Sequence, residues 1–264
     1  MSSTLPSNRY PLPRALFAQR FLALALATAS GLASAQAITV SAAASLQNAM
    51  REIGTAYQAA HPGSQVHFNF AASGPLLAQI AQGAPVDAFA SADQDTMDKA
   101  QSQGLVKPDT RFNFAANELV LISPLSQAAS LKALPDLKRV AIGRIAVGNP
   151  LTVPAGRYAQ AALTQQGLWP ALSAKLVFAD NVRQALNYVS RAEVDAGFVY
   201  RTDALLEQDK VRIDFAVPTP KPVLYPMALV AASPQPAMAL DFMKFVASPP
   251  GQALLKKHGF APAP

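Results

Sequence analysis

Small and hydroxyl-bearing residues stand at four places in the sequence where a helix is expected to begin. These places are the runs Ala42-Ala43-Ala44-Ser45-Leu46, Ser73-Gly74-Pro75, Pro154-Ala155-Gly156 and Asp180-Asn181-Val182. Small side chains let backbone N–H groups and hydroxyls approach a bound group closely, and the first N–H groups of a helix have no partner within it. The positive end of the helix dipole also attracts negative charge. Together these residues could bind an anion through neutral donors, although each run alone is also an ordinary helix start.

Strands and helices alternate around these runs in the first part of the chain. Apolar or alternating segments predict strands, and helical periodicity predicts helices. The strands are expected at residues 38–42, 66–70 and 86–91, and the helices at 46–57, 76–81 and 96–102. Such alternation is typical of a parallel or mixed α/β sheet that helices cover on both faces.

A second unit of the same kind follows. Its strands are expected at 118–122, 145–148 and 196–200, and its helices at 158–166 and 182–192. After a proline-rich connector at 217–222 come a strand at 224–230 and helices at 237–246 and 251–258. We therefore expect the chain to cross between two units twice and to leave a cleft between them, where small ligands preferentially bind. The four runs would lie at the carboxyl ends of strands, the edge of such sheets that binds ligands.

The first 35 residues have the features of an export signal. Its basic residues are Arg9, Arg14 and Arg20. An apolar run over residues 21–32 follows them and ends in the small-residue triplet Ala33-Ser34-Ala35, with no acidic residue before it. The run is shorter than the ~20 residues that a membrane-spanning helix needs. We expect cleavage after Ala35 and a soluble mature chain.

Composition and motifs argue against several classes of protein. The net charge of +6 includes the three arginines of the signal, and no dense cluster of basic and aromatic residues indicates a nucleic-acid surface. There is no cysteine, so a disulfide framework and a thiol site are excluded. No Gly-x-Ser-x-Gly motif occurs, and no His, Asp and Glu cluster has the spacing of metal ligands. The histidines are His61, His67 and His258, far from any nucleophile pattern. We expect neither an enzyme nor a cofactor.

Five motifs, in order along nearly the whole mature chain, resemble those of the bacterial periplasmic molybdate-binding proteins of ABC importers. The motifs are Ala42-Ala43-Ala44-Ser45-Leu46, Ser91-Ala92-Asp93, Val153-Pro154-Ala155-Gly156-Arg157-Tyr158-Ala159, Asn181-Val182-Arg183 and Gly197-Phe198-Val199-Tyr200. The resemblance implies a two-lobed periplasmic binding protein fold, in which two mixed α/β domains are joined by crossing strands around an interlobe cleft. One lobe would comprise residues 36–116 and 224–264, and the other residues 117–223.

The resemblance also implies which residues hold the oxyanion. In the family these are a serine in the Ala-Ala-Ser-Leu turn, a serine after the second strand, the alanine of Val-Pro-Ala-Gly, a valine before an arginine, and a tyrosine that ends a strand. The corresponding residues here are Ser45, Ser73, Ala155, Val182 and Tyr200. Ala155 and Val182 would contribute only backbone N–H groups. The sequence departs from the family beside Ser73, where relatives can have neighbouring serines.

A site made only of donors suits molybdate, because this anion is fully deprotonated near neutral pH. Arg183 could be a counter-ion or could lie outside the site. We expect the protein to capture molybdate or tungstate in the periplasm, to close its lobes around the anion and, as a monomer, to deliver it to the membrane permease. The alternatives are another anion, such as sulfate, phosphate or a small organic anion, and a secreted hydrolase.

Overall fold

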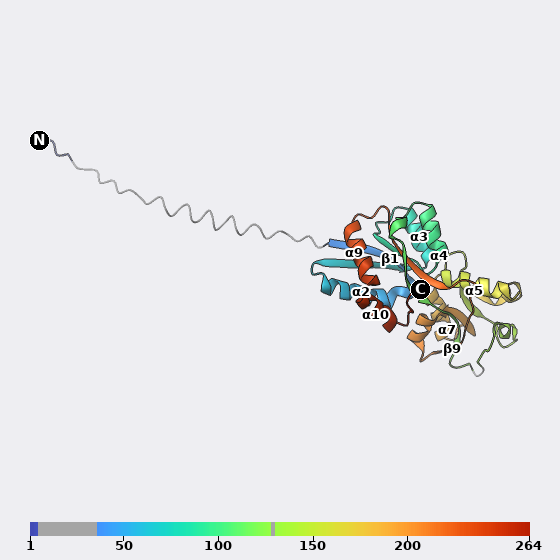
Figure 1. Cartoon of the computed structure of the whole chain (residues 1–264). Coiled ribbons are helices and arrows are strands. Elements are labelled where there is room, and N and C mark those ends of the chain that lie inside the picture. Colours follow the sequence, from blue (N-terminus) through green and yellow to red (C-terminus); the bar gives the residue numbers. More distant parts are fainter. Residues whose placement is uncertain (5–35, 128–129) are drawn as a thin grey trace. The chain divides into compact units, whose positions relative to one another are not determined.

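Two five-stranded mixed sheets form the framework of the chain (Figure 1). The first sheet has the order β2 (Ser64–Ala71), β1 (Gln36–Ala43), β3 (Ala88–Ala90), β10 (Val223–Leu229) and β4 (Phe112–Asn117). The second has the order β7 (Leu176–Ala179), β6 (Ile145–Gly148), β8 (Ala196–Tyr200), β5 (Leu119–Pro124) and β9 (Val211–Ala216). In both sheets the first three strands are parallel and the last two pairings are antiparallel. The expected fold class is therefore confirmed.

The computed structural model describes residues 1–4, 36–127 and 130–264. Residues 1–4 contain no helix or strand, and residues 36–264 form a unit by themselves. The expected export signal lies outside the described residues, apart from residues 1–4. Within the described ranges, no helix is long and apolar enough to cross a membrane.

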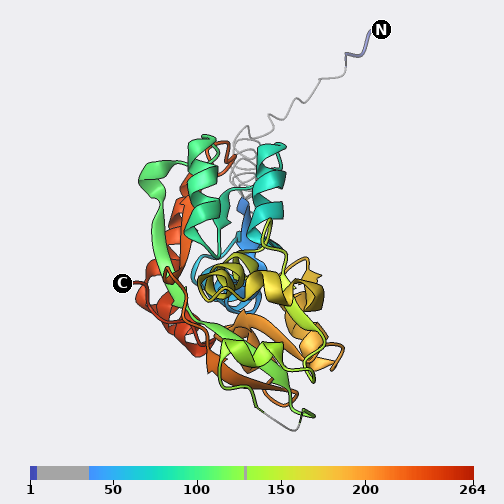
Figure 2. The ribbon, with the colours of Figure 1, turned by 90° about the vertical axis from the view of Figure 1, so that its right-hand side faces the viewer.

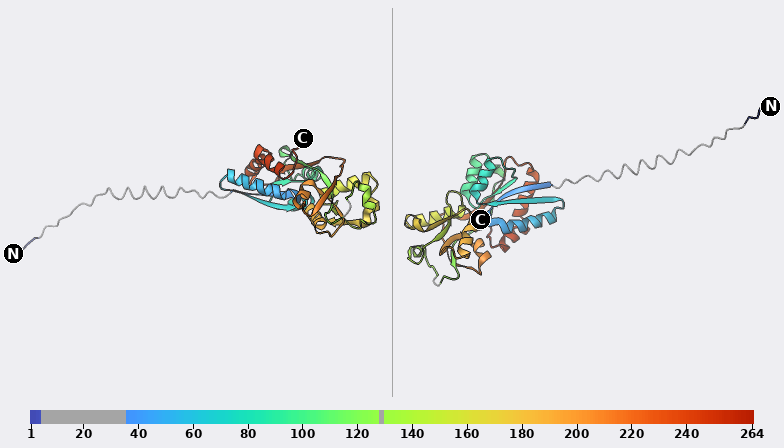
Figure 3. Two further views of the ribbon diagram at one scale, coloured as in Figure 1. Left: turned by 90° about the horizontal axis from the view of Figure 1, so that it is seen from below. Right: turned by 180° about the vertical axis from the view of Figure 1, so that it is seen from behind.

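Helices cover both faces of the first sheet. They are α2 (Gln47–Ala60), α3 (Ser73–Ala81), α4 (Gln94–Ser102), α9 (Pro236–Ala247) and α10 (Pro249–Lys257). Phe89 of β3 packs with α3 and α4 in one core cluster, whereas Ala88 and Ala90 belong to the cluster that contains α2 and α9. Successive residues of a strand point to opposite faces, so one strand serves both clusters. Figure 3 shows α2 beside β1 and β2.

The second sheet carries its own set of helices. They are α5 (Pro154–Gln165), α6 (Trp169–Leu172), α7 (Val182–Ser190) and α8 (Arg201–Ala204). Short 3-10 turns complete the elements, namely η1 (Ala44–Leu46), η2 (Pro108–Thr110), η3 (Leu134–Lys138), η4 (Ser173–Lys175) and η5 (Leu205–Glu207). Both α5 and α7 contact β6 and β8.

The chain passes between the sheets at two places. β4 of the first sheet leads through Glu118 into β5 of the second, and β9 of the second leads through residues 217–222 back into β10 of the first. Figure 2 shows the green segment with β4 and β5 running from one sheet to the other. We call the elements around the first sheet the first lobe and those around the second sheet the second lobe. The division at residues 116/117 and 223/224 remains a prediction.

Three strands, β4, β7 and β9, were not expected from the sequence. Each is an edge strand of its sheet. Edge strands are only half covered, and β4 and β9 accordingly mix polar with apolar residues. β7 is an apolar run of only four residues, which periodicity alone does not distinguish from a buried helix segment. In β7, Phe178 is 52% exposed, and β9 carries Arg212 and Asp214 among its apolar residues.

Ser73 stands at a helix start, as expected, but its hydroxyl does not cap α3. The N-cap is Ala72, Ser73 is the first helical residue, and no side chain caps this end of α3. The Ser73 hydroxyl instead accepts a hydrogen bond from the backbone N–H of Ala92, at 3.0 Å. At α7 a side chain does cap the helix, because Asn181 accepts from the N–H of Gln184 at 3.0 Å.

Candidate ligand-binding site

The five residues that were expected to bind the ligand line one small cavity between the two lobes. The lining residues are Ala43, Ala44, Ser45, Ala72, Ser73 and Ala92 from the first lobe, and Val153, Pro154, Ala155, Val182 and Tyr200 from the second. The empty volume of the cavity is about 200 Å³. A space of this size fits one small, compact group.

The carboxyl ends of the parallel strands bring these residues together. Ser45 follows β1, Ser73 follows β2, Ala155 follows β6, Val182 follows β7, and Tyr200 is the last residue of β8. Parallel strands end at the same edge of their sheet, and the two edges face the same cavity. Residues that lie far apart in the sequence therefore meet because of the sheet topology.

Two helices of the second lobe begin at the cavity. Pro154 is the first residue of α5, so Ala155 is the second, and Val182 is the first residue of α7. N–H groups in the first turn of a helix have no acceptor within the helix. Both helix starts can therefore offer backbone donors and the positive end of their dipoles to a ligand.

Each hydroxyl at the cavity has a defined partner in the protein. Ser45 Oγ lies 3.0 Å from the hydroxyl of Tyr225, and Ser73 Oγ accepts from the N–H of Ala92. Tyr200 donates its hydroxyl to the carbonyl of Ala92 over a long 3.4 Å. Burial raises the pKa of both Tyr200 and Tyr225 well above the usual value for tyrosine. Both phenols are therefore neutral at physiological pH.

Arg183 does not line the cavity, although its helix begins there. Its Nε donates to Asp203, whose side chain is fully buried. Its other nitrogens reach across to the first lobe, where they donate to the carbonyl of Ser45 at 3.2 Å and to the side chain of Asn48 at 3.0 Å. Burial raises the pKa of Asp203, and the Arg183 guanidinium opposes that shift. Arg183 is thus already paired beside the site.

A second arginine joins the lobes on another side of the cavity. Arg157 of α5 donates from Nε to Asp93 at 2.8 Å and from Nη2 to the Thr96 hydroxyl at 2.6 Å. The Asp93 side chain is only 4% exposed. The described residues that line the cavity have no charged side chains, and the ionised groups nearby form their pairs outside it.

The lobes also meet where Gly74 of α3 approaches Thr152. The N–H of Gly74 donates to the carbonyl of Thr152 at 3.1 Å. A Cβ at Gly74 would lie only 2.6 Å from that carbonyl oxygen, so a side chain there would push the lobes apart. The absence of a side chain at Gly74 therefore permits this close approach.

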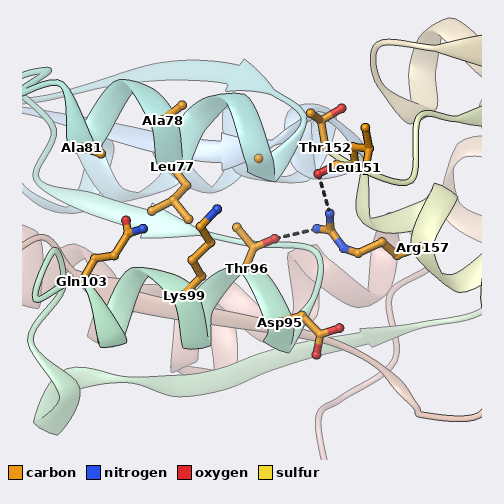
Figure 4. A pocket seen from close by; sticks show the side chains of 11 residues that line it. Leu77, Ala78, Ala81, Asp95, Thr96, Lys99, Gln103, Leu151, Thr152 and Arg157 are labelled. Carbon is orange, nitrogen blue, oxygen red and sulfur yellow. Dashed lines mark hydrogen bonds between the residues drawn. The ribbon is translucent and has the colours of Figure 1, made fainter.

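A larger open groove lies beside the cavity and is shown in Figure 4. Leu77 of α3, Lys99 of α4 and Leu151 of the second lobe are among its lining residues. Figure 4 shows Arg157 donating to Thr96 and to the carbonyl of Leu151 at its edge. None of the five expected ligand-binding residues lines this groove.

Some residues with clear structural roles at the site were not singled out from the sequence. Asp93 and Arg157 lie within two of the motifs that carried the family resemblance, so a signal for them was present. Asn117 and Tyr225, which contact each other 3.2 Å apart, lie on the paired strands β4 and β10. Nothing in their local sequence indicates that these two strands lie together.

The chain forms two mixed sheets and passes between them twice, and a small cavity lies where the strand ends of the two sheets face each other. This arrangement defines a two-lobed solute-binding protein. The chain belongs to the family of bacterial extracellular solute-binding proteins, whose family model matches residues 38–261.

Known proteins similar to this chain include molybdate-binding proteins. The molybdate-binding protein ModA of Escherichia coli is 38% identical over 250 residues, which cover 93% of this chain and 96% of that protein. A putative ABC transporter substrate-binding lipoprotein of Bacillus subtilis, YvgL, is 35% identical over 224 residues, covering 84% of this chain and 85% of that protein. The solved periplasmic molybdate-binding protein of Azotobacter vinelandii has a TM-score of 0.76 at 26% identity, covering 86% of this chain and all of that one.

These comparisons confirm the resemblance that the motifs indicated. Membership of the family makes the chain a binding protein and not an enzyme, and places it outside the cytoplasmic membrane, in the periplasm or extracellular space.

The buried pair of Arg183 and Asp203 generates a prediction about stability. Asp203→Asn leaves the guanidinium without its carboxylate, and breaking a buried pair in this way costs about 3 kcal/mol of the free energy of unfolding. Urea denaturation of the purified protein measures the change. Glu193→Gln is the control, because Glu193 lies 4.0 Å from Arg191 in an exposed pair and its loss should cost less than ~0.5 kcal/mol. Equal effects of the two substitutions would contradict the prediction.

Proposed function

We propose that this protein captures molybdate, and tungstate by the same contacts, and delivers it as a monomer to the membrane permease of an ABC importer. The observation that carries the proposal is the convergence of Ser45, Ser73, Ala155, Val182 and Tyr200 on one small cavity that no charged side chain of the described residues lines. The similarity to molybdate-binding proteins of other bacteria supports the choice of ligand.

Hydrogen-bond chemistry explains why such a cavity suits this ligand. A fully deprotonated oxyanion has only acceptor atoms, so hydroxyl and backbone N–H donors match all of them. Hydrogen bonds to an ionised acceptor are stronger than those between neutral groups, and a cavity without water strengthens them further. A protonated anion would need an acceptor as well, and neither Asp93 nor Asp203 lines the cavity.

Sulfate is the second candidate, because it carries the same charge as molybdate and also has only acceptor atoms. It is smaller, so the donors would have to approach more closely to replace its hydration. A calorimetric titration with molybdate, tungstate, sulfate and phosphate separates the candidates. The tightest binding should be to molybdate or tungstate, and tightest binding to sulfate or phosphate would replace the proposed ligand.

The two serine hydroxyls should carry a measurable share of the affinity. We expect Ser45→Ala and Ser73→Ala each to weaken molybdate binding about tenfold or more, since a hydrogen bond to a charged group contributes ~1.5–3 kcal/mol. Isothermal titration calorimetry measures the dissociation constants. Ser190→Ala, on the exposed end of α7, is the control and should bind as the unsubstituted protein does. Unchanged binding by the double variant of Ser45 and Ser73 would show that the ligand binds elsewhere.

Ligand binding should also favour the closed arrangement of the lobes. The donors come from both lobes, so all of them can reach the anion only when the lobes meet. Gly74→Ala should hinder closure, because its Cβ would lie 2.6 Å from the Thr152 carbonyl oxygen.

Small-angle X-ray scattering tests this mechanism. Molybdate should reduce the radius of gyration of the unsubstituted protein and of Gly143→Ala, where a Cβ would meet its nearest neighbour at an ordinary 3.6 Å. Gly74→Ala should compact less and bind molybdate more weakly. Equal compaction of both variants would contradict the role given to this contact, and no compaction of the unsubstituted protein would contradict closure.

Export through a cleaved signal is part of the same proposal. We expect the protein from the periplasmic fraction to begin at Gln36, because the small residues Ala33 and Ala35 fit the cleavage pattern. N-terminal sequencing together with intact mass reads the first residue directly. A chain that still begins at Met1 in that fraction would contradict cleavage.

A further inference from the structure

Tyr225 and Asn117 are not among the residues that line the cavity, yet Tyr225 contacts Ser45, which does, and Asn117 contacts Tyr225. The Tyr225 hydroxyl lies 3.0 Å from Ser45 Oγ, and Asn117 Nδ2 donates to the Tyr225 hydroxyl at 3.2 Å. The Tyr225 side chain is fully buried. The partners of Asn117 determine which group donates in each of these two hydrogen bonds.

The amide of Asn117 is fixed in one orientation. Its Oδ1 accepts the backbone N–H of Glu118 at 2.9 Å, so its Nδ2 must face the other way. There it donates to two hydroxyls, those of Tyr225 at 3.2 Å and Thr202 at 2.8 Å. An amide nitrogen has two protons and no acceptor capacity, so both contacts have Asn117 as the donor.

This orientation determines the direction at Tyr225. A phenol has one proton to donate, and its oxygen already accepts from Asn117. Among the residues that the structure describes, its other hydrogen-bond partner is Ser45 Oγ. Donation to Ser45 Oγ is therefore the arrangement that gives the buried phenol O–H an acceptor. Burial keeps the pKa of Tyr225 well above the usual value, so this donor is present throughout the physiological pH range.

The Ser45 hydroxyl can then donate its own proton in a hydrogen bond to a ligand in the cavity. Ser73 is in the same state, because its oxygen accepts the N–H of Ala92. A backbone N–H group orients the Ser73 hydroxyl, whereas the side chains of Tyr225 and Asn117 orient the Ser45 hydroxyl. These two side chains can be substituted.

The geometry points to Tyr225 and Asn117 as positioning residues that hold Ser45 as a hydrogen-bond donor and so make the cavity select fully deprotonated oxyanions over oxyanions that carry a proton. This inference rests on the proposed function, since it concerns the same cavity. Without the phenol, the Ser45 hydroxyl can rotate and accept a hydrogen bond from the O–H group of a protonated ligand. The selection should then weaken, although the cavity keeps its size.

Sulfate and hydrogen phosphate are the probes for this test. In mildly alkaline solution both are dianions of similar size, and they differ by one proton. Calorimetry on the full mature chain gives the ratio of their dissociation constants, with molybdate as the reference ligand. The unsubstituted protein should bind sulfate more tightly than hydrogen phosphate. In Tyr225→Phe that preference should fall about tenfold, equivalent to ~1.4 kcal/mol.

Thr202→Val is the matched control. It removes the other acceptor of the same Asn117 nitrogen, at a similarly buried position, and leaves Tyr225 and Ser45 in place. Its sulfate preference should equal that of the unsubstituted protein. An unchanged preference in Tyr225→Phe, or an equal fall in Thr202→Val, would overturn the inference, because only a general loss of packing would then be at work.

Asn117→Leu provides a second route if Tyr225→Phe does not fold. It removes the donor that fixes the direction of the phenol, so the sulfate preference should fall here too. An unchanged preference in folded Asn117→Leu would overturn the inference. If the unsubstituted protein binds none of these oxyanions, the proposed function fails instead, which is a distinct result.

Discussion

The need to replace the hydration of a doubly charged anion is the constraint on which the proposed site depends. Moving such an ion out of water is unfavourable unless donors take the place of its hydration shell. The donors here stand at the ends of strands in two different sheets, so neither lobe alone can surround a ligand. The division into two lobes and the double crossing of the chain are therefore what allow a cavity that is both enclosed and accessible before closure.

Charge near the cavity is arranged so that no ionised side chain of residues 36–127 and 130–264 lines it. Arg183 and Arg157 both lie within site motifs, but Asp203 and Asp93 neutralise them. Each arginine also donates to the first lobe, Arg157 to Asp93 and Arg183 to the carbonyl of Ser45, so both add contacts between the lobes that involve no ligand. A ligand can shift the equilibrium between open and closed forms only by its own differential contacts. In the proposed site those contacts are hydrogen bonds from neutral donors, and the arginines contribute to the closed form with or without a ligand.

The sequence predicts the central elements of both sheets and the residues around the cavity, and the reasons are physical. Central strands such as β5 and β8 are buried runs of apolar residues, and helix starts such as Pro154 have recognisable residues. The edge strands β4 and β9 mix polar and apolar residues, and β7 is too short an apolar run to be recognised as a strand. The partnership of Tyr225 with Asn117 depends on the pairing of β10 with β4, which are more than a hundred residues apart. Such a contact is a property of the topology and leaves no local signature.

The hydrogen bond between Asn117 and Tyr225 lies within the first lobe, and this bears on the order in which the lobes bind an anion. Asn117, Tyr225 and Ser45 all belong to the first lobe, because β4 and β10 are strands of the first sheet and Ser45 follows β1. The hydrogen bonds that orient the Ser45 hydroxyl therefore do not depend on closure, and the same holds for Ser73 with Ala92. Preorganised donors bind with less loss of entropy than donors that must be ordered on binding. We therefore infer that an anion first binds the first lobe, whose hydroxyls are already oriented, and that the helix starts of α5 and α7 reach it afterwards as the lobes close.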